Sequence, residues 1–248
     1  MSQNFFGEVC ANLTLSPHSN LRDKEAKRKA KASYRSRIYR VHKMHITNSL
    51  TTIGGFDMPV INPYEGTPPE NFIPFSRRNE IKSSSVAQTY ALHFYINDPQ
   101  FLCVYNDPDR YIDVLKRFHC VIGLDFSQYA NMTYPQRLIN NFMGKAYTAY
   151  FQKQGVLMIP NVTWSLPDSY EYCFDGHPQN SIIAINSTAI KQHDSSIYLW
   201  LKGYEEALKR LQPSLILRYG EFIPGENEEI SVYYGNEYLN LLRNGSKW

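Results

Sequence analysis

Four short apolar segments between residues 120 and 221 dominate the hydrophobic pattern of this chain, and each ends in polar or small residues. The segments are VIGLDFS (121–127), VLMIPNVTW (156–164), SIIAINST (181–188) and LILRYGE (215–221). Helical patterns over 134–153 and 195–211 separate the first segment from the second and the third from the fourth. Apolar runs that alternate with helices are typical of a parallel sheet buried on both faces. The pattern therefore predicts an α/β fold with these segments as parallel strands.

Further elements are expected on both sides of this region. The segments 89–96, 101–105 and 231–235 have strand composition, and short helices fit 108–118 and 236–243. About five to seven strands are too few for a closed (β/α)₈ barrel, which typically needs about 250 residues. We therefore expect a mostly parallel open sheet flanked by helices. A barrel-like β/α arrangement is the alternative.

Residues 54–80 contain five prolines, and proline cannot donate a hydrogen bond to a sheet. Aromatic residues recur along this stretch at Phe56, Tyr64, Phe72 and Phe75. We expect an extended wrap that uses these side chains as anchors. The predicted organisation is a basic N-terminal extension over 1–53, followed by an α/β domain over 54–248 that includes the wrap.

The net charge of +3 is unevenly distributed. Residues 21–43 hold ten Lys or Arg and two Asp or Glu, a balance of +8, on a predicted amphipathic helix. Basic side chains at this density can neutralise nucleic-acid phosphates. The candidate phosphate-binding residues are Arg28, Lys29, Lys31, Arg35, Arg37, Arg40 and Lys43. A solvated helix, or one that docks on a protein partner, is the alternative.

Polar residues follow the predicted strands, and ligands of parallel sheets gather at the carboxyl ends of the strands. The residues expected on this rim are Asp125, Ser127, Asn161, Trp164, Asn186, Tyr219 and Glu221. Asn161 could hydrogen-bond a base edge, and Trp164 could stack on a base or sugar. Core packing is the simpler interpretation of Trp164.

Three carboxylates are candidate catalytic residues: Asp125, Asp175 and Glu221. Together they could bind Mg²⁺ for phosphoryl chemistry, as in a metal-dependent nuclease or phosphotransferase. Capping of the turn that follows its strand is the simpler interpretation of Asp125. The metal requirement, and whether the protein is an enzyme, stay open at this point.

Other familiar sites are disfavoured. Cys173, Asp175 and His177 share one loop, whereas catalytic residues usually converge from distant segments. The four cysteines form no C-x-x-C pair, which argues against a structural zinc site. Neither phosphate-binding glycine motif occurs, and G-x-S-x-G is missing too. No apolar run is long enough to span a membrane.

An ordered set of motifs between residues 56 and 220 resembles the uncharacterised DUF4417 family. The motifs are FDMPVI, IGLDFSQYANM, VLMIPNVTW after Gln154–Gly155, YCFDGHP, SIIAINST and LQPSLILRYG. The chain departs from the family at Leu124, where a proline is frequent, and at Leu166, where a second acidic residue is frequent. The resemblance implies a protein of bacteria, phages or mobile elements, but no activity.

These observations favour a phage or mobile-element protein that binds or acts on nucleic acid through its basic helix and a site at the strand ends. One alternative is an α/β enzyme that acts on a small molecule or nucleotide. The other is a structural or interaction module of an assembly. The expected location is the cytoplasm of a bacterial or phage-infected cell, because the N-terminus makes a poor signal peptide.

Overall fold

The computed structural model describes residues 37–188, 190 and 194–235. The chain divides after His45 into two units, and each is described by itself. In the first unit, residues 37–41 are helical, and the apolar side chains of Ile38 and Val41 are exposed. In the described part of the chain, no helix is long and apolar enough to cross a membrane.

The second unit is built on parallel strands that follow one another in chain order. They are β3 (Asn71–Pro74), β4 (Tyr90–His93), β5 (Cys120–Ile122), β6 (Met158–Ile159), β7 (Ile182–Asn186), β8 (Leu215–Tyr219) and β9 (Ser231–Tyr234). Strands β3 to β6 form one hydrogen-bonded sheet and β7 to β9 another. A single parallel bridge from Asn161 to Ala184 joins the two sheets. A small antiparallel pair, β1 (Thr52–Ile53) and β2 (Met58–Pro59), precedes them.

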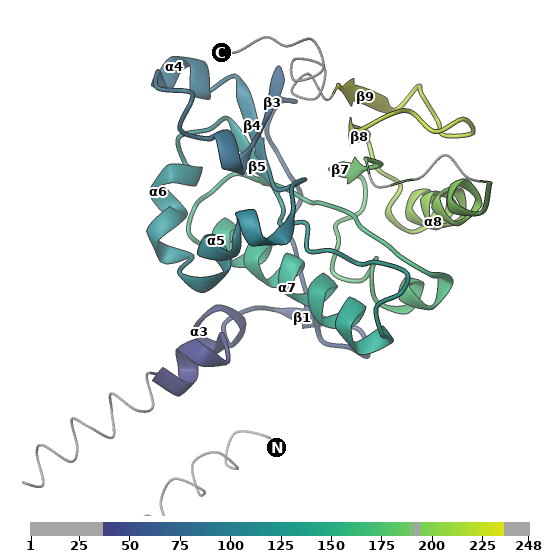
Figure 1. Ribbon diagram of the computed structural model, residues 1–248, viewed down its shortest axis with the longest axis horizontal. Helices are drawn as coiled ribbons and strands as arrows, with labels where there is room; N and C mark the ends of the chain where they lie inside the picture. The colour runs from purple at the N-terminus through teal and green to yellow at the C-terminus, as the bar shows by residue number, and fades with distance from the viewer. Residues whose placement is uncertain (1–36, 189, 191–193, 236–248) are drawn as a thin grey trace, which may run out of the picture. The chain divides into compact units, whose positions relative to one another are not determined.

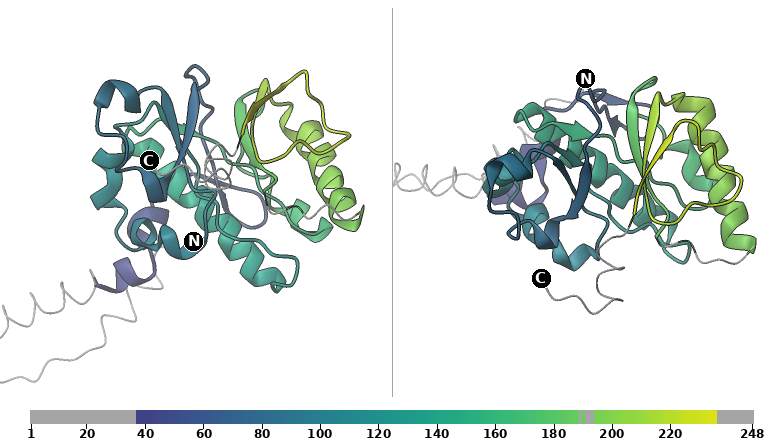
Figure 2. Two further views of the ribbon diagram at one scale, coloured as in Figure 1. Left: turned by 45° about the horizontal axis from the view of Figure 1, so that its top comes forward. Right: turned by 90° about the horizontal axis from the view of Figure 1, so that it is seen from above.

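Helices lie outside the strands, as Figures 1 and 2 show. They are α4 (Ser84–Ala87), α5 (Leu102–Asn106), α6 (Ile112–Leu115), α7 (Tyr134–Lys153) and α8 (Asp194–Leu211). Helix α3 (Met44–Thr47) spans the boundary between the two units. Four 3-10 turns complete the described elements: η1 (Phe75–Arg77), η2 (Asp98–Gln100), η3 (Asp109–Tyr111) and η4 (Pro167–Glu171). The long helix α7 begins at a Thr133–Gln136 capping box with Pro135 in its first turn.

Two expectations about local structure were wrong. The predicted strand 101–105 is helix α5, because Phe101 and Val104 are buried while Leu102 is exposed, which is helical spacing. The Pro-rich wrap contains strand β3, which the sequence did not indicate. Pro74 fits there because β3 is paired on one side only. The predicted helix over 236–243 lies outside the described residues.

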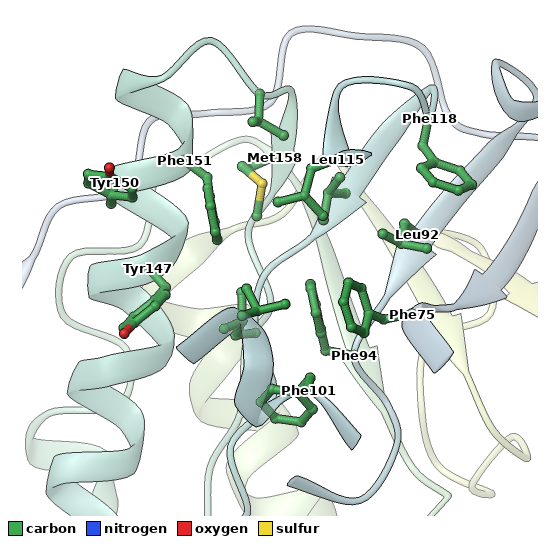
Figure 3. Close-up of a cluster of buried hydrophobic side chains, with 14 of the residues drawn as sticks. Phe75, Leu92, Phe94, Phe101, Leu115, Phe118, Tyr147, Tyr150, Phe151 and Met158 are labelled. Atoms are coloured by element: carbon green, nitrogen blue, oxygen red, sulfur yellow. The ribbon is translucent and has the colours of Figure 1, made fainter. Parts of the chain in front are cut away.

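Apolar side chains pack on both faces of the strands, as expected for parallel sheets. Figure 3 shows the cluster between the first sheet and helices α5, α6 and α7, where Phe94, Phe101 and Phe151 are fully buried. A second cluster packs α8 against β7 and β8. A third fills the opposite face of both sheets and includes Tyr95, Tyr219 and Tyr234.

The α/β fold with an open, mostly parallel sheet is confirmed. Tyr234 of β9 stacks on Phe72 of β3 with ring centroids 3.9 Å apart, and its hydroxyl donates to the Pro69 carbonyl. The first and last strands therefore meet through side chains. Among the described residues no backbone pairing joins β3 to β9, so the sheet does not close into a barrel.

Candidate functional site at the carboxyl ends of the strands

Asp125 lies at the centre of a hydrogen-bond network just beyond the end of β5. Its Oδ1 accepts a hydrogen bond from Asn161 Nδ2 at 3.1 Å, and its Oδ2 accepts one from Asn186 Nδ2 at 3.3 Å. Asn161 follows β6 and Asn186 ends β7. The three residues therefore come together because their parallel strands end at the same edge, as the sequence predicted.

Further donors fix the orientation of both amides. The Tyr95 hydroxyl donates to Asn161 Oδ1 at 3.0 Å. The Thr188 amide and hydroxyl donate to Asn186 Oδ1 at 2.9 and 2.8 Å. Each amide oxygen is thereby engaged, so each amide nitrogen faces Asp125. The result is a network that crosses the ends of four consecutive strands, β4 to β7.

Asp125 lines a cavity of about 390 Å³. This volume falls in the range of roughly 300–1,000 Å³ that is usual for small-molecule sites. The polar side chains of the lining are Asn97, Asp125, Ser127, Gln128, Thr163, Ser165, Asn186, Thr188 and Ser196. The aromatic side chains are Tyr95, Phe126, Tyr129, Trp164 and Trp200. None of the described lining residues is Lys, Arg or His.

Burial raises the pKa of Asp125 to about 6, although the two amide hydrogen bonds favour the carboxylate and lower it. Asp98 adds a smaller raising effect through charge repulsion. The carboxylate of Asp98 accepts hydrogen bonds from the amide and hydroxyl of Ser127, which holds it beside the site. Asp125 can therefore exchange a proton close to neutral pH, as a general acid or base must.

This shift predicts a pH-dependent stability difference between the wild type and Asp125→Asn. Between about pH 4 and 6 the folded state binds more protons at Asp125 than the unfolded state, so stability is lost as the pH rises. The variant lacks this loss. The difference in unfolding free energy between the variant and the wild type should therefore shift in favour of the variant by up to about 3 kcal/mol between pH 4 and pH 7. Urea denaturation at a series of pH values measures this difference. If the unfolding free energies of the two proteins changed in parallel with pH, the raised pKa of Asp125 would be contradicted.

Two glycines allow α7 to approach the end of β5 and so position Asp125. A Cβ at Gly144 would lie 2.9 Å from the Leu124 carbonyl oxygen. A Cβ at Gly123 would lie 2.6 Å from Thr148 Oγ1. Both distances are too short for a methyl group, so larger residues would push the backbone before Asp125 away from the helix.

Trp164 forms one wall of the cavity by packing on α8. Its indole lies 4.5 Å from that of Trp200, measured between ring centroids, and tilts toward Phe174 at 6.3 Å. Gly203 of α8 leaves room for this indole, because a Cβ there would overlap its ring. Trp164 thus both packs on the core and faces the cavity.

Gly203→Ala should therefore displace Trp164 and distort this wall. We expect a loss of about 1–3 kcal/mol in unfolding free energy, as overpacking usually costs. Intrinsic tryptophan fluorescence should also shift. Gly55→Ala is the control, because a Cβ at Gly55 meets no atom within 4 Å. Equal behaviour of the two variants would contradict the proposed packing.

A buried ion pair supports the other side of Trp200. Arg218 Nη1 lies 2.6 Å from the carboxylate of Glu226, and both side chains are 1% exposed. Trp200 Nε1 donates to the same carboxylate, as does the Ile223 amide at 3.2 Å. Glu226 therefore connects β8, α8 and the loop after β8.

Helix α7 presents buried polar side chains at four-residue spacing to the segment 163–175, which includes the 3-10 turn η4. Arg137 donates to Asp168 at 2.6 Å, and Asn141 donates to the Thr163 carbonyl at 3.3 Å. Lys145 donates to three carbonyls, those of Tyr172 and Cys173 at 2.9 Å and that of Asp175 at 2.7 Å. The contacts of Asn141 and Lys145 replace the water that the backbone carbonyls of the segment have lost.

Several predicted rim residues do not line the cavity. Tyr219 is buried, and its ring stacks on that of Tyr95 with centroids 5.2 Å apart. It therefore contacts the network through Tyr95 and not through the cavity. Glu221 is exposed, and its carbonyl accepts a hydrogen bond from Ser187 Oγ. Asp175 lies beside Gly54 in a turn with Gly176. Of the three candidate carboxylates, only Asp125 lines the cavity.

The described residues contain no group of three or more His, Cys, Asp or Glu side chains that could hold a metal ion. The Mg²⁺ site of Asp125, Asp175 and Glu221 is therefore not assembled in this structure. Burial raises the pKa of the Cys173 thiol to about 12, which leaves little thiolate at neutral pH. The loop of Cys173 and His177 is thus better suited to packing than to nucleophilic chemistry.

Sequence reasoning missed several residues of the site. Tyr95 and Trp200 complete the network and the wall, but they come from segments that the chain pattern assigns to the core. No sequence pattern indicated that the Tyr95 hydroxyl and the Trp200 indole would take part in the site. His93 lies beneath the network against Tyr219, and burial lowers its pKa to about 3, so it is neutral.

Most of the predicted phosphate-binding residues, namely Arg28, Lys29, Lys31 and Arg35, lie outside the described residues. Arg37 and Arg40 are exposed on the helical stretch 37–41, and Lys43 is half-buried in the turn that follows.

A family model described as "Domain of unknown function (DUF4417)" matches residues 51–235. The chain is also 35% identical to the Gene 1 protein of Mycobacterium phage L5, over 53% of this chain and 57% of the phage protein. The Gene 1 protein of Mycobacterium phage D29 is 33% identical, over 52% of this chain and 48% of that protein. The chain thus spans about half the length of the curated relatives it matches. No solved structure matches.

Proposed function

This chain belongs to the DUF4417 family, and from that premise we propose that it is a phage-associated protein that binds nucleic acid and holds part of it in the Asp125 cavity. The observation that carries the proposal is the Asp125 network, which holds a carboxylate at the wall of a cavity at the strand ends. Sites of this kind in parallel sheets bind ligands.

The basic segment 21–43 carries the positive charge that the described cavity lining lacks. Its balance of +8 suits a phosphate backbone, whereas the described cavity lining offers no cation. In this proposal the basic segment binds phosphates, and the cavity binds an uncharged part of the same ligand. The proposed phosphate contacts are Arg28, Lys29, Lys31, Arg35, Arg37, Arg40 and Lys43.

Within the cavity, Asp125 is the proposed proton acceptor or donor. A carboxyl group with a pKa of about 6 changes its charge near physiological pH, and the amides of Asn161 and Asn186 keep it oriented. Ser127 positions the neighbouring Asp98, and Trp164 forms the stacking wall.

Fluorescence anisotropy with labelled single- and double-stranded oligonucleotides tests the proposal. We expect binding that weakens as salt rises, because each phosphate contact releases a counterion. Combined charge reversal, Arg35→Glu with Arg37→Glu and Arg40→Glu, should reduce affinity at least about tenfold and flatten the salt dependence. Unchanged binding by this triple variant would remove the basic segment from the proposal.

A second candidate function is an enzyme that acts on a free small molecule. The observation that favours it is the cavity itself, whose size and mixed polar and aromatic lining suit a small ligand without any nucleic acid. In that case oligonucleotides would not bind, while Asp125→Asn would still abolish turnover of the small substrate without lowering the melting temperature.

A further inference from the structure

We infer that the Asp125 cavity accepts an uncharged heterocyclic base that presents N–H donors, as a nucleoside or an unpaired nucleic-acid residue, and that it excludes phosphate. This inference rests on the proposed function and names the part of the ligand that enters the cavity. It depends on the charge of the lining, on the free acceptor capacity of Asp125 and on the aromatic walls.

The charge of the lining disfavours phosphate. Asp125 is the one carboxylic acid among the described lining residues, and no Lys, Arg or His there offsets its charge. Asp98 lies close enough to raise the pKa of Asp125, so a second negative charge acts on the same space. A phosphate in this cavity would be repelled by both carboxylates and would meet no cation among the described lining residues.

The carboxylate of Asp125 has acceptor capacity to spare. An ionised carboxylate offers about four lone-pair sites, and the amides of Asn161 and Asn186 use two of them. The remaining sites suit adjacent N–H groups of a base, in the way that Asp or Glu accepts from the amino group of cytosine. Because Tyr95 and Thr188 lock both amides, the carboxylate does not need to reorganise on binding.

The walls suit a flat ligand. Trp164 and Trp200 form an indole pair on one side of the cavity, and Phe126 and Tyr129 line it as well. Stacking of a base on an aromatic side chain contributes about 1–3 kcal/mol and tolerates any base. Enzymes that act on single bases combine such stacking with hydrogen bonds to the base edge.

Isothermal titration of the full chain at pH 7.5 tests the inference. The probes are cytidine, adenosine, guanosine and thymidine, their 5′-monophosphates and inorganic phosphate. At least one nucleoside should bind, its monophosphate should bind no more tightly, and inorganic phosphate should not compete. Asp125→Asn should weaken the nucleoside at least about tenfold. Asp113→Asn, which removes an exposed carboxylate from α6, should not.

The outcomes separate this inference from the proposed function. Binding of a monophosphate tenfold more tightly than its nucleoside would overturn the exclusion of phosphate. Oligonucleotide binding without binding of any nucleoside would overturn the inference and leave the proposed function intact. If Asp125→Asn fails to fold, the wild type provides the test, since protonation of Asp125 should weaken nucleoside binding as the pH falls from 7.5 to 5. Affinity that is constant over this range would contradict the role of Asp125.

Discussion

Replacing Glu226 with alanine should lower the free energy of unfolding by about 3–5 kcal/mol, because the change leaves Arg218 as an uncompensated buried charge. Trp200 and the Ile223 amide lose the same acceptor. At about 2–4 °C per kcal/mol for a domain of this size, the melting temperature should fall by roughly 6–20 °C. Thermal unfolding followed by circular dichroism measures the change.

The matched control for this prediction is Glu228→Ala, which removes an exposed carboxylate from the same loop. It should change the free energy of unfolding by less than about 0.5 kcal/mol, as surface substitutions usually do. Similar melting temperatures for the two variants would mean that the Arg218–Glu226 pair is not buried in solution. Fluorescence of the tryptophans gives an independent measure, since Trp200 donates to Glu226.

Lys145→Met should be the other strongly destabilising change. Methionine keeps much of the apolar stem, but it leaves the carbonyls of Tyr172, Cys173 and Asp175 without their donor. An unpaired buried polar group costs about 1–3 kcal/mol, so the three carbonyls together should cost about 3–9 kcal/mol where no water replaces the amino group of Lys145. Urea denaturation measures it.

An exposed lysine provides the comparison. Lys116→Met changes the same side chain on the surface, so it should leave the urea midpoint nearly unchanged. If Lys145→Met were equally mild, water would have to enter and satisfy the three carbonyls. Protection of the segment 163–175 against proteolysis would then also be unchanged, whereas we expect it to fall.

Much of the fold could be predicted from periodicity, because long apolar runs and a 20-residue helix such as α7 carry strong signals. The short segments were harder. Helix α5 has five residues, and the segment FLCVY (101–105) that overlaps it has the aromatic and β-branched side chains of a strand at Phe101, Val104 and Tyr105. Strand β3 lies among prolines, and only its position at the sheet edge makes Pro74 acceptable.

For the candidate site, the sequence predicted which residues meet at strand ends but not where residues in loops lie. Asp125, Asn161 and Asn186 meet because their strands run parallel. Asp175 ends the segment 163–175, which α7 holds in place, so the strand-end argument did not apply to it. Glu221 follows Gly220, whose φ of 98° turns the chain away at the end of β8. Side-chain pairs such as Trp164 and Trp200 require tertiary contacts that no local pattern encodes.

The junction between the two sheets has a mechanical consequence. Beyond the one bridge at Asn161 and Ala184, the halves of the fold share no ladder in the described chain. Asp125 and Asn161 belong to the first half, while Asn186 and Trp200 belong to the second, and the views in Figures 1 and 2 separate the halves in the same way. A ligand bound between Asp125 and Trp200 would contact both sheets and bridge the junction between them. A ligand that contacts both halves would therefore favour the arrangement in which Asp125 and Trp200 line one cavity.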